Sequence, residues 1–74
     1  MSERVRDRAN GLSLTISELE VLQLLAGGFA PKEISLKRKC TINTVRVHIA
    51  NAISKLGCHG SGEAIRAAQN ANLI

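Results

Sequence analysis

The sequence is poor in aromatic residues, with a single Phe and no Trp or Tyr among its 74 residues. Single-stranded nucleic acids are usually bound by stacking bases on aromatic rings, so any nucleic-acid partner should be duplex. Long apolar runs are also missing, because Gln23, Gly27 and Gly28 interrupt the longest one, and a membrane helix needs about 20 apolar residues. The charged start lacks the apolar stretch of a secretion signal. We therefore expect a cytoplasmic protein.

Cysteine is scarce as well, and its placement argues against two classes of site. Cys40 and Cys58 are too few for a disulfide framework, and with His59 they match no zinc-site spacing. No Cys–His or Ser–His–Asp arrangement has supporting context, and no Gly-rich phosphate loop occurs. We expect no metal, no cofactor and no enzymatic activity.

What the chain does contain is typical of one small globular domain with a basic surface. Hydrophobic residues make up 45% of the sequence and charged residues 22%, and a chain of this length forms a single core. Ten Lys and Arg against six Asp and Glu leave a formal charge of +4. Such a balance favours polyanionic partners.

Turn and cap signals divide the chain into an arm and a domain. Residues 1–13 alternate charges and contain the turn signal Asn10-Gly11, which predicts a flexible N-terminal arm before a domain over 14–74. Thr15 and Glu18 fit a capping box that starts a helix over about 15–26. Its predicted apolar face consists of Leu19, Leu22, Leu25 and Ala26.

Three further helices follow. Pro31 predicts the first turn of a short helix ending near residue 39, with Ile34 facing inward and Leu36 as a second inward candidate. Thr41 is a natural N-cap for a helix over 41–56, and Gly57 ends it. The buried stripe of that helix is Val45, Ile49, Ala52, Ile53 and Leu56. An Ala-rich segment after Gly60 completes an all-α, four-helix bundle without strands.

A short helix, a turn of about three residues and a longer helix with a polar outer face match the helix-turn-helix layout. Arg46 can bond guanine O6 and N7 together, while Val47 and Ala50 can meet thymine methyl groups. The start of the longer helix favours phosphate contacts, and a lysine lies further along it. The predicted phosphate contacts from this reasoning are Thr41, Asn43, Thr44 and Lys55.

Several segments together resemble the LuxR-type (GerE-like) helix-turn-helix of bacterial transcription regulators. They are LTISELEVLQLLAGG from residue 14, KEIS from residue 32, TVRVHIANAISKLG from residue 44 and EAIRAA from residue 63. The resemblance implies a domain that binds duplex DNA through its second and third helices. It implies base contacts by Arg46, Val47 and Ala50, with phosphate contacts by Thr44, Lys55 and Lys32; Asn51, which also carries the resemblance, is assigned to phosphate.

The sequence departs from the family pattern at four positions. Ser17 and Ser61 stand where Arg is common, which removes two polar or ionic contacts and predicts weaker phosphate binding. Arg38 replaces a core Leu and is expected to bury its stem and extend its guanidinium to water or phosphate. Lys39 replaces a small turn residue and would need an unfavourable left-handed backbone if the turn is retained.

The predicted function is sequence-specific binding of duplex DNA by a transcription regulator. The resemblance implies dimerisation through the fourth helix, whose small residues permit close approach, although that helix could merely cap the core. The predicted homodimer interface is Ala64, Ala67, Ala68 and Leu73. The alternative is a small module that heterodimerises with larger LuxR-type regulators and titrates them. Family members mostly follow a phosphoreceiver or ligand-binding domain, so an excised output domain is a third possibility.

Overall fold

The computed structural model describes residues 14–74. Over that range the chain forms four helices and no strand: α2 (Ile16–Ala26), α3 (Pro31–Arg38), α4 (Ile42–Lys55) and α5 (Ser61–Asn70). The predicted all-α, four-helix architecture is thereby confirmed. The predicted arm over 1–13 lies outside the described residues.

Local signals determine where α2 begins and how the helices end. The Thr15 hydroxyl accepts the Glu18 amide at 3.1 Å, and the Glu18 carboxylate accepts the Thr15 amide at 3.0 Å, so the capping box is confirmed. After α2, Gly28 has a φ of +95°, a left-handed backbone that glycine adopts readily. The turn after α3 has Lys39 at φ 57° and ψ 47°. The left-handed lysine expected from the sequence is therefore present.

Helix α3 is oriented by a single buried apolar residue. Ile34 has no exposed surface, whereas Leu36 is 71% exposed, so the inward candidate Leu36 was wrong. Residues two positions apart in a helix point about 200° away from each other. Because α3 packs on the rest of the domain through one side, Ile34 and Leu36 cannot both face inward. Pro31 does begin the helix, as predicted.

The core divides into two clusters that share α2. One cluster joins α2, α4 and α5 through Leu14, Leu22, Ala52, Ala64 and Ala68. The other joins α2, α3 and α4 through Val21, Ile34 and Val45. Because α2 packs against neighbours on two sides, the adjacent residues Val21 and Leu22 are both fully buried. Ala26, predicted on the apolar face of this helix, is exposed instead.

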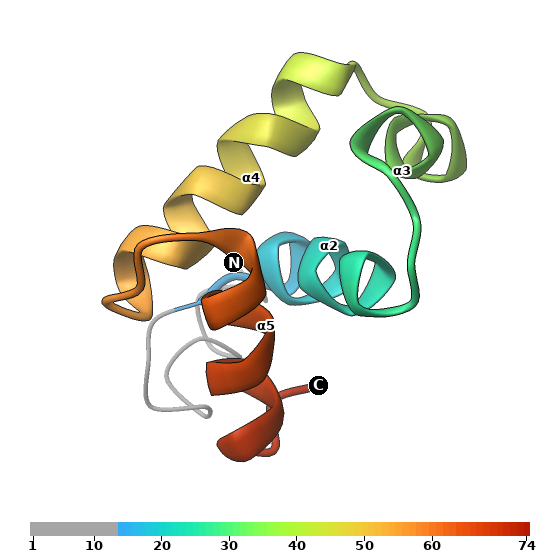
Figure 1. The fold of residues 1–74 in the computed structure, drawn as a ribbon. Helices are drawn as coiled ribbons and strands as arrows, with labels where there is room; N and C mark the ends of the chain where they lie inside the picture. Colours follow the sequence, from blue (N-terminus) through green and yellow to red (C-terminus); the bar gives the residue numbers. More distant parts are fainter. Residues whose placement is uncertain (1–13) are drawn as a thin grey trace.

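Figure 1 shows α2 at the centre of the arrangement, with α3 beside the N-terminal end of α4 and α5 near the C-terminal end of α4. Among the described helices α2 contacts all three others, while α3 and α5 do not pack together. Helix α4 packs through its inner side and is left with one long outer side. That outer side is the surface on which the predicted reading residues lie.

Candidate nucleic-acid interface

Helices α3 and α4, joined by residues 39–41, form the predicted helix-turn-helix. The two helices are held together by Ile34 and Val45, which pack with Val21 of α2 and have no exposed surface. Fixing α4 near its N-terminal end determines which side of it faces outward. The turn of three residues is as short as the sequence predicted.

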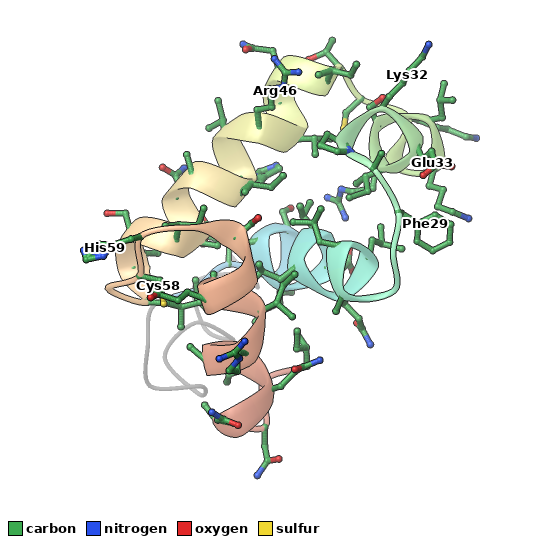
Figure 2. The ribbon with its side chains drawn as sticks, in the orientation of Figure 1. Phe29, Lys32, Glu33, Arg46, Cys58 and His59 are labelled. Carbon is green, nitrogen blue, oxygen red and sulfur yellow. The ribbon has the colours of Figure 1, made fainter. Side chains whose placement is uncertain are left out.

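The three predicted base-reading side chains all lie on the exposed side of α4. Arg46, Val47 and Ala50 are exposed, and Val47 is unusual among large apolar residues in being 49% exposed. Figure 2 shows Arg46 on the outer surface in the N-terminal half of α4. Residues 46 and 50 are one helical turn apart and therefore adjacent on the surface. The arrangement provides one guanidinium beside two small or branched apolar groups, and the base contacts remain predictions.

The N-terminal end of α4 presents hydroxyl groups to solvent. The Thr41 hydroxyl accepts the Thr44 amide at 3.1 Å, and its oxygen lies 2.9 Å from the Thr44 hydroxyl oxygen. Thr41, Asn43 and Thr44 are all exposed. Thr41 is the predicted N-cap, and this is confirmed. Amides and hydroxyls at a helix start provide donors for phosphate.

Two further predicted phosphate contacts are placed where they can reach a ligand on the outer side. Lys32 lies in the first turn of α3, is exposed, and appears on the same side of the molecule as Arg46 in Figure 2. Asn51 is exposed in the second half of α4. Both residues are exposed, and their phosphate contacts remain predictions.

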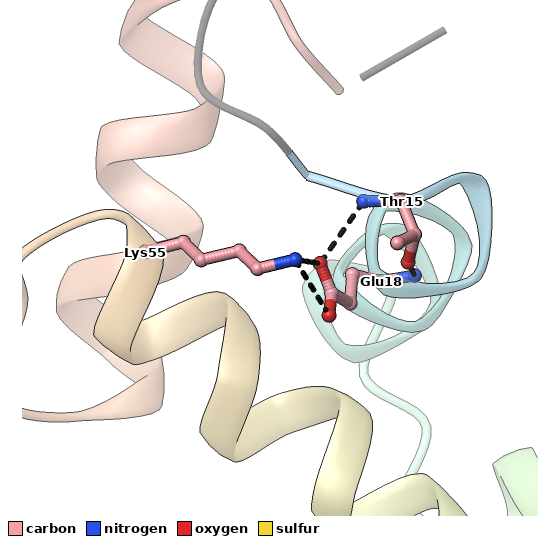
Figure 3. A network of polar contacts seen from close by, with 3 residues as sticks. All are labelled: Thr15, Glu18 and Lys55. Carbon is pink, nitrogen blue, oxygen red and sulfur yellow. Dashed lines mark hydrogen bonds and ion pairs between the residues drawn. The ribbon is translucent and has the colours of Figure 1, made fainter. Parts of the chain in front are cut away.

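Lys55 differs from the other predicted phosphate contacts because its ammonium group already has a partner. Its Nζ lies 2.9 Å from Oε1 and 3.2 Å from Oε2 of Glu18. Glu18 is only 3% exposed, and Figure 3 shows that its carboxylate also accepts the Thr15 amide. Sequence reasoning missed this pair because its members are 37 residues apart and no local pattern relates them.

Arg38 is likewise engaged within the protein. Its guanidinium bonds to the Glu20 carboxylate and donates to the Ser17 hydroxyl at 3.1 Å, both on α2. The expectation that this guanidinium extends to water or phosphate was wrong. The side chain is 23% exposed, and its Nε is buried without a hydrogen-bond partner.

The predicted dimer face on α5 needs a correction at two of its four positions. Ala64 and Ala68 have no exposed surface because they belong to the core cluster shared with α2 and α4. They cannot also contact a second copy. Ala67 and Leu73 are partly exposed and remain available.

Within residues 14–74 no group of three or more His, Cys, Asp or Glu side chains gathers as a metal site would require. Cys40 and Cys58 are both free and half-buried, the first near the α3–α4 turn and the second, with His59, on the α4–α5 connection (Figure 2). No helix in the described part of the chain has the length and apolar character needed to cross a membrane.

Comparison with known proteins decides the family. The profile of the bacterial regulatory proteins of the luxR family, also called GerE, matches residues 12–68, a span that includes α2, α3, α4 and most of α5. The chain belongs to the luxR family. The chain therefore contains a LuxR-type helix-turn-helix DNA-binding domain of transcription regulators, as the sequence resemblance implied. The family is one of DNA-binding regulators rather than enzymes.

The luxR-family chain is similar to curated response regulators over its whole length. Response regulator protein VraR from Staphylococcus saprophyticus is 37% identical over 75 residues, which cover 100% of this chain and 36% of that protein. VraR from Staphylococcus aureus gives the same identity and coverage. The chain thus spans about a third of the length of these relatives.

Two solved structures share the fold of this luxR-family domain. The transcription factor GerE superposes with a TM-score of 0.78 at 40% identity, covering 81% of this chain and 90% of that one. The response regulator ChrA of a heme-sensing two-component system gives a TM-score of 0.78 at 34% identity, covering 82% of this chain and 30% of that one. The match therefore extends over most of the domain in space as well as in sequence.

Proposed function

We propose that this chain binds a specific sequence of duplex DNA in the bacterial cytoplasm, with α4 in the major groove. The observation that carries the proposal is the outer side of α4, where Arg46, Val47 and Ala50 are exposed together. A guanidinium and apolar groups on one helix face suit the donor, acceptor and methyl pattern of the major groove. The buried contacts of Val45 hold that face outward.

Around this reading face, polar groups at the starts of two helices supply phosphate contacts in the proposal. Lys32 in the first turn of α3 and Thr44 in the first turn of α4 are both exposed. Phosphate contacts of this kind set the register of a protein on the duplex without reading sequence. Thr41, Asn43 and Asn51 take supporting phosphate contacts.

The proposed assembly is a homodimer on an inverted repeat. A single recognition module typically buries only about 600–1,000 Å² on DNA, so two copies would bind far better than one. Two-fold pairs of such modules reach successive major grooves about 10 bp apart. With Ala64 and Ala68 in the core, the pairing surface on α5 is limited to partly exposed residues such as Ala67 and Leu73.

The test is selection of bound duplexes from a random pool at stated salt, followed by binding measurements from low to moderate salt. The proposal predicts an enriched inverted repeat and an affinity that falls steeply with salt. With the Lys55 and Arg38 cations paired internally, each phosphate that another Lys or Arg neutralises contributes about −0.9 to the log–log slope. No enriched sequence, or an affinity unchanged by salt, would refute it.

The same experiment addresses the alternative of a titrating partner. A chain that selects no duplex, yet forms a complex with a larger luxR-family regulator, supports heterodimerisation as the function. The exposed set of Arg46, Thr44 and Lys32 favours DNA binding, because a pure titrator has no need of such a surface.

A further inference from the structure

We propose that Lys55 is a positioning residue: by bonding Glu18 it fixes the direction of the recognition helix, and it does not contact phosphate. This inference rests on the proposed function, in which α4 reads DNA. It assigns a task within DNA binding to the ion pair between Lys55 and the buried carboxylate of Glu18. It also replaces the phosphate role that the sequence suggested for Lys55.

The geometry leaves the Glu18 carboxylate with internal partners only. Oε1 accepts the Thr15 amide at 3.0 Å and Lys55 Nζ at 2.9 Å, and Oε2 accepts the same Nζ at 3.2 Å. Figure 3 shows the Lys55 side chain extended from the last turn of α4 toward the start of α2. The carboxylate side chain is 4% exposed and the lysine side chain 33%.

The carboxylate can use two of the three N–H donors of Lys55 Nζ, so a phosphate that took over these bonds would have to draw Nζ away from Glu18. Glu18 would then keep the Thr15 amide as its partner inside the protein, and a buried charge that loses its counterion is strongly disfavoured. The compensating contact would be made at the solvated surface, where an ion pair contributes little. The Lys55–Glu18 pair should therefore remain closed when DNA is bound.

The pair and the apolar contacts hold α4 at two separate places. Val45, near the N-terminal end, is packed in the cluster with α3, and Lys55 is the last residue of the helix. Arg46, Val47 and Ala50 all lie between these two points in the sequence. Apolar burial such as that of Ala52 is non-directional, whereas a lysine bonded to both carboxylate oxygens restricts the rotation and tilt of the helix end.

The experiment compares Lys55→Met and Glu18→Gln with the wild-type chain on a duplex selected by the wild type from a random pool. Binding is measured over a range of salt concentrations. Positioning predicts that each variant binds roughly 10-fold more weakly, as expected if the reading orientation is populated about one time in ten. It also predicts an unchanged salt slope, rescue by Lys55→Arg, and no added loss in the double variant.

A phosphate role for Lys55 predicts different changes in affinity and in salt slope for the same two variants. If Lys55 contacts phosphate, Lys55→Met would flatten the slope by about 0.9, and Glu18→Gln would remove the competing carboxylate, so affinity would rise. Either result overturns the inference and leaves the proposed function intact. If the wild type selects no duplex, the proposed function itself fails. Arg66→Met, which removes an exposed cation from α5, is the control for net charge.

Circular dichroism establishes that each variant is folded at the temperature of binding. Should the variants not fold, the wild type alone provides the test through the side-chain NMR signals of its lysines. On addition of the selected duplex, the Lys55 ammonium signal should move less than that of Lys32. A larger shift at Lys55 than at Lys32 would overturn the inference.

Discussion

The Arg38 guanidinium donates to the Ser17 hydroxyl at 3.1 Å, joining the last residue of α3 to the first turn of α2. Both positions depart from the family pattern, which commonly has Arg at position 17 and Leu at position 38. The arginine that the sequence lacks on α2 is thus replaced by one that reaches α2 from α3. The contact is polar where the family pattern implies apolar packing.

Because Arg38 makes a polar contact where the family pattern has an apolar side chain, we expect Arg38→Leu to stabilise the domain. The substitution removes a buried Nε that has no partner in the described part of the chain, and it places an apolar side chain beside Leu24. Replacing ionic contacts by apolar ones is often stabilising, and we expect the free energy of unfolding to rise by about 1 kcal/mol. Thermal and urea unfolding measure it.

Glu20→Gln is the matched control, because it removes the ion pair and keeps the arginine. Glu20 is half-exposed in its side chain, so the change should stay within about 0.5 kcal/mol. A loss of more than about 1 kcal/mol on Arg38→Leu would mean that the polar contact stabilises α3 more than apolar packing can.

Lys39→Gly should also stabilise the domain. Lys39 has a left-handed backbone, at φ 57° and ψ 47°, which costs a non-glycine residue about 1–2 kcal/mol. After the greater chain entropy of unfolded glycine is subtracted, we expect a gain of about 1 kcal/mol in the free energy of unfolding. Lys39→Ala keeps the backbone cost and removes the charge, so it should give no such gain. Equal effects of the two substitutions would refute the explanation.

Ala68→Glu should unfold the monomer. Ala68 has no exposed surface and packs in the cluster with Leu22 and Ala52, so a glutamate there is a buried, unpaired charge as well as an overpacked side chain. The expected loss exceeds about 3 kcal/mol, a large part of the stability of so small a domain. Gln69→Glu, at the exposed neighbouring position, should leave the fold intact. Circular dichroism of the two variants shows whether each is folded. A folded Ala68→Glu chain would contradict the burial of Ala68 in the core.

Most of the fold prediction rests on local sequence patterns, which are helix caps and helical periodicity. The Thr15–Glu18 capping box, the Thr41 cap and the left-handed Lys39 act over a few residues, so the sequence alone predicts them. The stripe containing Val45 follows from helical periodicity, and Val45 is indeed fully buried. The family segments then give the order and packing of the helices.

What the sequence could not predict depends on contacts between distant residues. Glu18 had one visible role, as a capping residue, and its second role with Lys55 arises only when α4 folds back across α2. Ala64 and Ala68 could have formed either a core or a dimer face, because a small-residue stripe suits both; packing against α2 and α4 decided it. Leu36 is apolar yet exposed, since the side of α3 that packs is set by Ile34.

Whether the outer side of α4 reads duplex DNA is tested by measuring the affinity and sequence preference of the Arg46→Ala variant. Selected duplexes and binding constants at fixed salt would be compared among the wild type, Arg46→Ala and the charge control Arg66→Ala. For Arg46→Ala alone we expect a loss of about 1–3 kcal/mol in binding free energy and a relaxed preference at one base position. Unchanged affinity and an unchanged selected sequence for a folded Arg46→Ala chain would contradict it.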